Sequence, residues 1–139
     1  MMGACGDAPA IPFIRVADAS EGTIQKATDI GALGIIVPMV DGAEKMADAV
    51  RYAKYPPQGR RSQGGGQYGR LWGRDYRQTW NDNGLIFAMV ETLEGTAEAA
   101  SIATVEGVDG VFVASGDLGS FSGKRQGEPD YERLVARIK

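Results

Sequence analysis

The sequence contains no histidine and only one cysteine. The lack of histidine excludes Ser–His and Cys–His nucleophilic catalysis, and it excludes zinc sites built on imidazole. A lone Cys5 cannot form an internal disulfide, which is typical of a protein from a reducing compartment, and we expect a cytoplasmic one. Any acid–base chemistry must therefore come from carboxylates, tyrosine, lysine or a metal-bound water.

The sequence also lacks long apolar runs and an excess of positive charge. No apolar stretch approaches the ~18 residues that span a bilayer, and residues 1–7 lack the features of a signal peptide. The formal net charge is −3. We therefore expect neither a membrane nor nucleic acid as a partner. RNA contact by the arginines and aromatic residues of segment 55–80 is a minor alternative.

Apolar runs alternate with helix-like segments along the whole chain. This pattern predicts strands at 11–17, 34–40, 85–90 and 108–114, and helices at 22–30, 43–53, 92–104 and 131–138. Asp18 or Ser20 is expected to cap the first helix, Asp41 the second, and Gly31 to end the first. Repeated strand–helix units imply a parallel sheet with right-handed crossovers.

Four such units amount to half of a (β/α)8 barrel, which takes about 250 residues. We predict an α/β fold: a partial TIM-type barrel with about four parallel βα units, a flexible amino terminus at 1–10 and one incomplete barrel domain at 11–139. An isolated half barrel leaves two apolar edge strands unpaired. The chain is then an incomplete gene product, a half that pairs with a second copy, or a small open sheet.

The segment from residue 55 to residue 80 is rich in glycine, proline and arginine. Its length predicts a functional or mobile loop, with a short helix over residues 75–80. The preceding helix is expected to end at Tyr55, because a residue before proline disfavours the α region.

Two acidic residues follow neighbouring predicted strands. Glu91 comes directly after the strand at 85–90, and Asp117 follows the strand at 108–114 through Ser115 and Gly116. Ligands of α/β folds gather at the carboxyl ends of strands. Two convergent carboxylates suit a hard divalent cation and leave positions for substrate and water. The alternative is that each is a solvated acid at a strand end.

Arg15 interrupts an otherwise apolar strand. The two-residue period places Phe13, Arg15 and Ala17 on one face of that strand. Buried cations are rare unless they are paired. Arg15 is therefore expected either to form an edge or interfacial ion pair or to bind an anion or oxyanion near Glu91 and Asp117.

Six strings occur in a fixed order: IRVA, GIIVPMV, YPPQGRR, VETLEG, VEGVDGVFV and GDLG. In this order they resemble the HpcH/HpaI family of class II, metal-dependent pyruvate aldolases, whose members include 4-hydroxy-2-oxoheptanedioate aldolase. The resemblance runs from about Ile11 to Gly127 and covers the middle of the family's barrel.

The resemblance implies an aldehyde-lyase that cleaves or forms 4-hydroxy-2-oxo acids through a metal-bound pyruvate enolate. The implied substrates are pyruvate or another 2-oxo acid plus an aldehyde, and the implied assembly is a homo-oligomer. Glu91 and Asp117 match the family's metal ligands, with Mg²⁺ as the expected ion and Mn²⁺ or Co²⁺ as alternatives. Arg15 matches the arginine that contacts the keto oxygen of pyruvate.

Four further residues take roles from the same resemblance. Ser115 and Gly116, with Asp117, stand where backbone amides meet the pyruvate carboxylate, although Ser115 replaces the usual proline. Asp29 matches an aspartate near a neighbouring subunit's site. Arg61 matches the arginine of the family's P-P-x-G-x-R loop, and Ser62 follows it where glycine is usual.

The sequence also departs from the family. Nothing before Ile11 supplies the histidine and the acid that help proton transfer in the family's first two strands, and the last two βα units are missing. We therefore expect this chain to be weak or inactive as an aldolase. The competing interpretation is a non-catalytic truncated barrel that binds a divalent metal or associates with a partner barrel.

Overall fold

The computed structural model describes residues 10–64 and 68–139, so most of the expected flexible segment 1–10 lies outside the described residues. The strands are β1 (Phe13–Arg15), β2 (Gly34–Val37), β3 (Leu85–Val90) and β4 (Gly110–Val113). The helices are α2 (Glu21–Asp29), α3 (Ala43–Ala53), α4 (Tyr68–Trp72), α5 (Tyr76–Asn83), α6 (Leu93–Ala97), α7 (Ala99–Ala103), α8 (Ser115–Ser122) and α9 (Pro129–Ile138).

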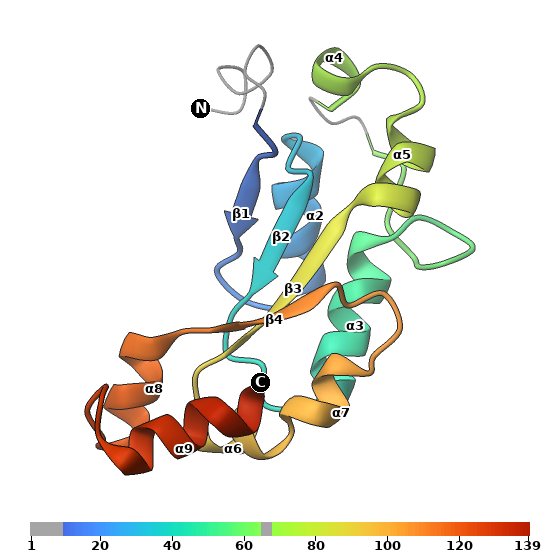
Figure 1. Cartoon of the computed structure of the whole chain (residues 1–139). Coiled ribbons are helices and arrows are strands. Elements are labelled where there is room, and N and C mark those ends of the chain that lie inside the picture. Colours follow the sequence, from blue (N-terminus) through green and yellow to red (C-terminus); the bar gives the residue numbers. More distant parts are fainter. Residues whose placement is uncertain (1–9, 65–67) are drawn as a thin grey trace.

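The four strands form one parallel sheet in the order β1-β2-β3-β4 (Figure 1). Arg15 pairs with Ile36, Ile36 with Phe87, and Phe87 with Gly110, so one register row crosses the whole sheet. Sequential strands lie next to each other and are joined through helices, as expected for repeated βα units. The prediction of an α/β fold with four parallel βα units is confirmed.

One face of the sheet packs against helices α2, α3 and α7. Figure 1 shows α3 and α7 next to each other. The strand residues on this face are apolar and fully or almost fully buried: Val16, Ile35, Val37, Ile86, Ala88 and Val90. From the helices, Ile24, Met46 and Ile102 complete this core with no exposed surface. The alternation of side chains along each strand therefore produces a helix-covered face.

The opposite face carries Phe13, Arg15, Phe87 and Phe112. The rings of Phe13 and Phe87 meet edge to face with 5.8 Å between centroids. A Cβ atom at Gly34 would lie 2.2 Å from the Phe13 ring, so a larger residue there would have to displace that ring. Phe13 is 40% exposed and Phe112 is 45% exposed. This face is thus apolar but only partly covered, as for the interior of an unclosed barrel.

Several local predictions need correction. Asp41 does not cap α3: the N-cap is Gly42, and the Asp41 carboxylate instead accepts a hydrogen bond from Thr92. Ser20 is the N-cap of α2, but its side chain makes no capping bond, and Asp18 Oδ1 accepts a hydrogen bond of 2.8 Å from the N–H of Ser20 itself. Gly31 ends α2 with a φ of 103°, as predicted. In the described ranges, no helix is both long and apolar enough to cross a bilayer.

Three segments differ from the predicted elements. The single helix predicted at 92–104 is two helices, α6 and α7, because Glu98 leaves the helical conformation. The predicted loop at 55–80 contains α4 and most of α5, so only the short helix was foreseen there. The segment after β4 forms the helix α8. The sequence does not predict this helix, because glycine and serine have low helix propensity.

Candidate functional site

Glu91 directly follows β3 and is only 4% exposed. Its Oε1 accepts a hydrogen bond of 2.7 Å from the backbone N–H of Met39, which lies just after β2. Met39 is the non-glycine residue with positive φ (52°) in the described part of the chain. The carboxylate is therefore held at the carboxyl end of the sheet by a backbone in a rarely adopted conformation.

Asp117 lies in the first turn of α8 and is exposed. The start of this helix is tied to the end of β3, because the N–H of Ala114 donates to the carbonyl of Val90 at 3.2 Å. This bond brings the helix start beside Glu91. Asp117 follows β4 through Ser115 and Gly116, as the sequence predicts, but these residues are the first turn of a helix, which the sequence does not predict.

The Asp117 carboxyl lies close enough to Glu91 to affect its pKa. Burial raises the pKa of the Glu91 carboxyl above its ordinary value of 4.5, and the neighbouring Asp117 carboxylate raises it further. The Met39 N–H and the positive charge of Arg15 act in the opposite direction. Two acids at one place, one of them buried, form a site where a cation relieves the repulsion.

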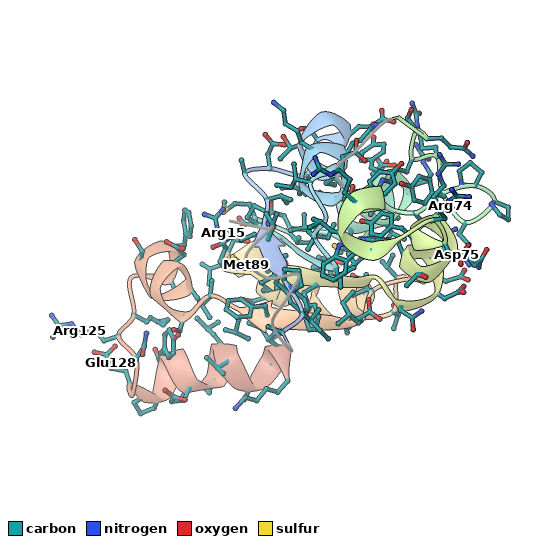
Figure 2. All side chains as sticks on the ribbon, turned by 90° about the horizontal axis from the view of Figure 1, so that it is seen from above. Arg15, Arg74, Asp75, Met89, Arg125 and Glu128 are labelled. Carbon is teal, nitrogen blue, oxygen red and sulfur yellow. The ribbon has the colours of Figure 1, made fainter. Side chains whose placement is uncertain are left out.

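Arg15 is the last residue of β1 and lies on the sheet face that carries Phe13. Its Nη1 donates to the carbonyl of Val16 at 3.0 Å, and the side chain is exposed. Figure 2 labels Arg15 and Met89, which both belong to strands of the sheet. Among the described residues Arg15 forms no ion pair within 4 Å, so the edge-ion-pair alternative is not found there.

Ser115 and Gly116 form the first turn of α8 with Asp117. The first N–H groups of a helix have no partner within the helix, and they carry partial positive charge. The carbonyl of Ser115 accepts a hydrogen bond of 3.0 Å from the Tyr131 hydroxyl, which ties α8 to α9. A Cβ atom at Gly116 would meet nothing within 4 Å, so the chain's own packing does not require glycine there.

Asp29 and Arg61 lie away from this cluster. Asp29 ends α2, before β2 begins, and therefore lies toward the amino ends of the strands. Arg61 Nη2 donates to Asp29 Oδ1 at 2.7 Å, and the Arg61 side chain has no exposed surface. Within this chain the two residues form an internal ion pair. The role of Asp29 near a neighbouring subunit's site and that of Arg61 as the arginine of the family's loop stay predictions.

Pattern reasoning missed the segment after β2. Met39, Val40 and Asp41 all contact the segment around Glu91, through hydrogen bonds to Glu91, Met89 and Thr92 respectively. Met39 and Thr92 both lie in strings that carry the family resemblance. Nothing in their spacing indicates that they touch, because the contact depends on the pairing of β2 with β3.

The donor set fits a hard divalent cation bound by few protein ligands. In residues 10–64 and 68–139 no three Asp, Glu or Cys side chains gather at one point. Two adjacent carboxylates leave most coordination positions to water and substrate, as in Mg²⁺ sites that also bind a ligand. The buried Glu91 has one oxygen occupied by the Met39 N–H. Its other oxygen is the one available to an ion.

A family model described as HpcH/HpaI aldolase/citrate lyase matches residues 2–137 of this chain. A hydroxypyruvate/pyruvate aldolase of Pseudomonas aeruginosa is 37% identical over 134 residues, which are 94% of this chain and 50% of that protein. A 2-keto-3-deoxy-L-rhamnonate aldolase of Klebsiella pneumoniae is 35% identical over 129 residues, or 89% of this chain and 48% of that protein.

The fold has solved counterparts. The crystal structure of an HpcH/HpaI aldolase/citrate lyase family protein from Burkholderia cenocepacia matches with a TM-score of 0.87 and 31% identity. The match covers 97% of this chain and 56% of that one. The chain thus spans about half the length of the curated relatives it matches.

Proposed function

Because the chain belongs to the HpcH/HpaI aldolase/citrate lyase family, we propose that it carries the cation-binding and 2-oxo-acid-binding part of a carbon–carbon lyase site. The reaction is the cleavage or formation of a 4-hydroxy-2-oxo acid, with pyruvate or another 2-oxo acid and an aldehyde as partners. The observation that carries the proposal is the convergence of Glu91 and Asp117 at the carboxyl end of the sheet. The aldolase names of the relatives support the reaction class.

Glu91 and Asp117 hold the divalent cation in this proposal, with Mg²⁺ as the first choice and Mn²⁺ or Co²⁺ as alternatives. The cation supplies Lewis-acid polarisation of the 2-oxo acid. Glu91 is suited to the role because one of its oxygens is already fixed by the Met39 N–H at 2.7 Å. Asp117 is suited because it is exposed toward solvent, from which the substrate arrives.

Arg15 and the start of α8 orient the substrate. The guanidinium of Arg15 is exposed and acts electrostatically on Glu91, so it is close enough to balance negative charge that develops on the keto oxygen. The first-turn amides at Ser115 and Gly116 favour an anion, and the 2-oxo acid offers its carboxylate. The open space at Gly116 supports close approach of that carboxylate.

Proton transfer is the weak step for this chain. It has no histidine, so carboxylates, tyrosine, lysine or a metal-bound water would have to replace a positioned general base, which typically contributes about 10²- to 10⁴-fold. We therefore expect slow exchange of the C3 protons of pyruvate, reduced by about that factor relative to a relative that has the base.

Exchange of these protons in D₂O with Mg²⁺, followed by ¹H NMR, tests the proposal. Glu91→Gln is expected to abolish the exchange, and Asp48→Asn on the exposed face of α3 is expected to leave it unchanged. Equal exchange in Glu91→Gln and wild type would contradict the assignment of Glu91.

A second candidate function is association with further βα units, either a second copy or a partner barrel, without catalysis. The partial exposure of Phe13 (40%) and Phe112 (45%) on one sheet face supports it. Sedimentation distinguishes the two. A defined oligomer whose melting temperature rises with Mg²⁺ supports a working assembly, whereas a monomer that strongly binds a hydrophobic dye supports an incomplete barrel.

A further inference from the structure

We propose that Asp41 and Thr92 are positioning residues: their hydrogen bond holds the loop after β2 so that the Met39 N–H fixes one oxygen of Glu91 and leaves the other for a cation. Only the last step, the binding of a cation by Glu91, rests on the proposed function. The positioning of Glu91 itself rests on the geometry of this chain.

Met39 has an unusual backbone conformation. Its φ of 52° lies in the left-handed region, which a residue with a long side chain seldom adopts without support from its surroundings. In this conformation the N–H donates to Glu91 Oε1 at 2.7 Å, and the carbonyl accepts from Lys45 Nζ. In this conformation both backbone polar groups of Met39 form hydrogen bonds with side chains, the N–H with Glu91 and the carbonyl with Lys45.

Asp41, two residues after Met39, is hydrogen-bonded to Thr92. The Thr92 hydroxyl donates to Asp41 Oδ1 at 2.8 Å, and the same oxygen of Thr92 accepts from the N–H of Gly95 at 3.0 Å. Thr92 is only 6% exposed, whereas the Asp41 side chain is 45% exposed and its second oxygen lies 3.5 Å from Lys45 Nζ, so the bond is buried on the Thr92 side alone. The N–H of Val40 adds a bond of 3.1 Å to the carbonyl of Met89. Val40 and Asp41, the two residues after Met39, are thus both hydrogen-bonded to the segment around Glu91.

The loop after β2 and the first turn of α6 approach each other closely at Val40 and Gly95. A Cβ atom at Gly95 would lie 2.5 Å from the carbonyl oxygen of Val40. Because that oxygen belongs to the backbone, a larger residue would force the loop away from the first turn of α6. Gly95 therefore lets Asp41 reach Thr92, and this contact is independent of Glu91 itself.

Together these contacts act on Glu91 from outside its own strand. A carboxylate whose one oxygen is fixed by an amide presents the other oxygen in one direction. Groups that orient metal ligands in this way typically change metal affinity by about 10- to 100-fold when they are removed. Neither Asp41 nor Thr92 is assigned a ligand role, so in this proposal their effect on affinity is transmitted through Met39 and Glu91, and a direct effect of the Asp41 charge is the alternative that the test must separate.

Hydrogen exchange of the Met39 amide in the 139-residue chain, without metal, tests the positioning directly. Asp41→Ala is expected to speed this exchange roughly tenfold or more, because a hydrogen bond to a charged group is worth about that factor. Asp41→Asn keeps an oxygen that accepts from Thr92, and it is expected to retain the slow exchange. Asp48→Ala, which removes an exposed acid of the same helix region, is the matched control.

Mn²⁺ affinity, measured by electron paramagnetic resonance, tests the consequence. Asp41→Ala is expected to bind Mn²⁺ about 10- to 100-fold more weakly, whereas Asp41→Asn and Asp48→Ala stay near wild type. Thr92→Val and Thr92→Ser form a second pair from the other side of the bond. Thr92→Ser is expected to behave as wild type and Thr92→Val as Asp41→Ala, so the test does not depend on one variant folding.

The outcomes separate this inference from the proposed function. Equal losses in Asp41→Ala and Asp41→Asn would show a simple charge effect and overturn the positioning role. Unchanged Met39 exchange in Asp41→Ala would overturn it as well, whatever the metal does. Wild-type failure to bind Mn²⁺ together with the expected exchange pattern would instead overturn the proposed function and the cation-binding step, and leave the positioning of Glu91 standing.

Discussion

The guanidinium of Arg61 forms an ion pair with the carboxylate of Asp29, with 2.7 Å between Nη2 and Oδ1, and the Arg61 side chain is completely buried. Four aromatic rings surround its Cζ atom at 4.4 to 5.6 Å from their centroids, from Tyr55, Tyr68, Tyr76 and Trp80. Burial raises the pKa of Tyr76 to about 12, and Arg61 acts against this rise. The ion pair thus joins α2 to the segment before α4 through a buried charge.

We predict that Asp29→Ala destabilises the protein by about 3 kcal/mol, because it leaves the buried Arg61 charge without its partner. Nε and Nη1 of Arg61 already lack a hydrogen-bond partner among the described atoms, so without Asp29 only the surrounding aromatic rings would stabilise the charge. Urea unfolding measures the change, with Asp48→Ala as the exposed control. A loss below about 1 kcal/mol, the range of surface ion pairs, would contradict a structural role for this pair.

Two glycines are predicted to respond differently to alanine. A Cβ atom at Gly84 would lie 2.5 Å from the Trp80 ring and from the Trp80 carbonyl, so Gly84→Ala is expected to cost about 1–3 kcal/mol. Gly116→Ala meets open space and is expected to leave thermal stability unchanged. It should nevertheless weaken binding of a 2-oxo acid, measured by calorimetry with pyruvate and Mg²⁺. Unaltered pyruvate affinity would argue against the start of α8 as the carboxylate site.

The pH dependence follows from Glu91. Its pKa is raised in the folded state above the ordinary value of 4.5, mainly by burial and then by Asp117. The folded chain therefore binds more protons than the unfolded chain in this window, and metal-free stability falls as pH rises from the ordinary to the raised value. Glu91→Gln removes this dependence and is expected to be more stable than wild type at pH 7 without metal. Parallel stability curves from pH 4 to 8 for the two proteins would contradict this expectation.

Phe112 is predicted to drive association. It is 45% exposed on the partly covered sheet face, and β4 is an edge strand in the described sheet. Phe112→Asp is expected to reduce both dye binding and self-association in sedimentation experiments. Leu93→Asp, at another exposed apolar residue, is the matched control because Leu93 lies on α6 and not on the sheet. Identical behaviour of the two variants would show that the sheet face has no special role.

The sequence predicts much of this fold because periodicity and strand–helix alternation are local signals. Ile35 and Val37 belong to a nearly continuous apolar run, and Arg15 lies on the face opposite Val16, as its period of two predicts. The helix α8 was missed because Gly116, Gly119 and three serines have weak helical propensity, and its formation depends on contacts with α6 and α9.

Some residues of the candidate site are likewise predictable from local sequence signals, and others are not. Glu91 and Asp117 are found by their positions after apolar runs. The role of Asp41 was mispredicted as a helix cap, because an acid before a helix is the usual signal for one. Its carboxylate instead bonds to Thr92, 51 positions away. A contact across that separation arises from the pairing of β2 with β3 and has no local signature.

Paramagnetic broadening by Mn²⁺ in ¹H–¹⁵N spectra tests the central claim most directly, since the claim is a cation between Glu91 and Asp117. The amide signals of Met39, Glu91 and Gly116 are expected to disappear at the lowest Mn²⁺ concentrations in wild type. In Glu91→Gln and Asp117→Asn those signals should persist. Broadening that begins elsewhere, or that is the same in all three proteins, would contradict the site.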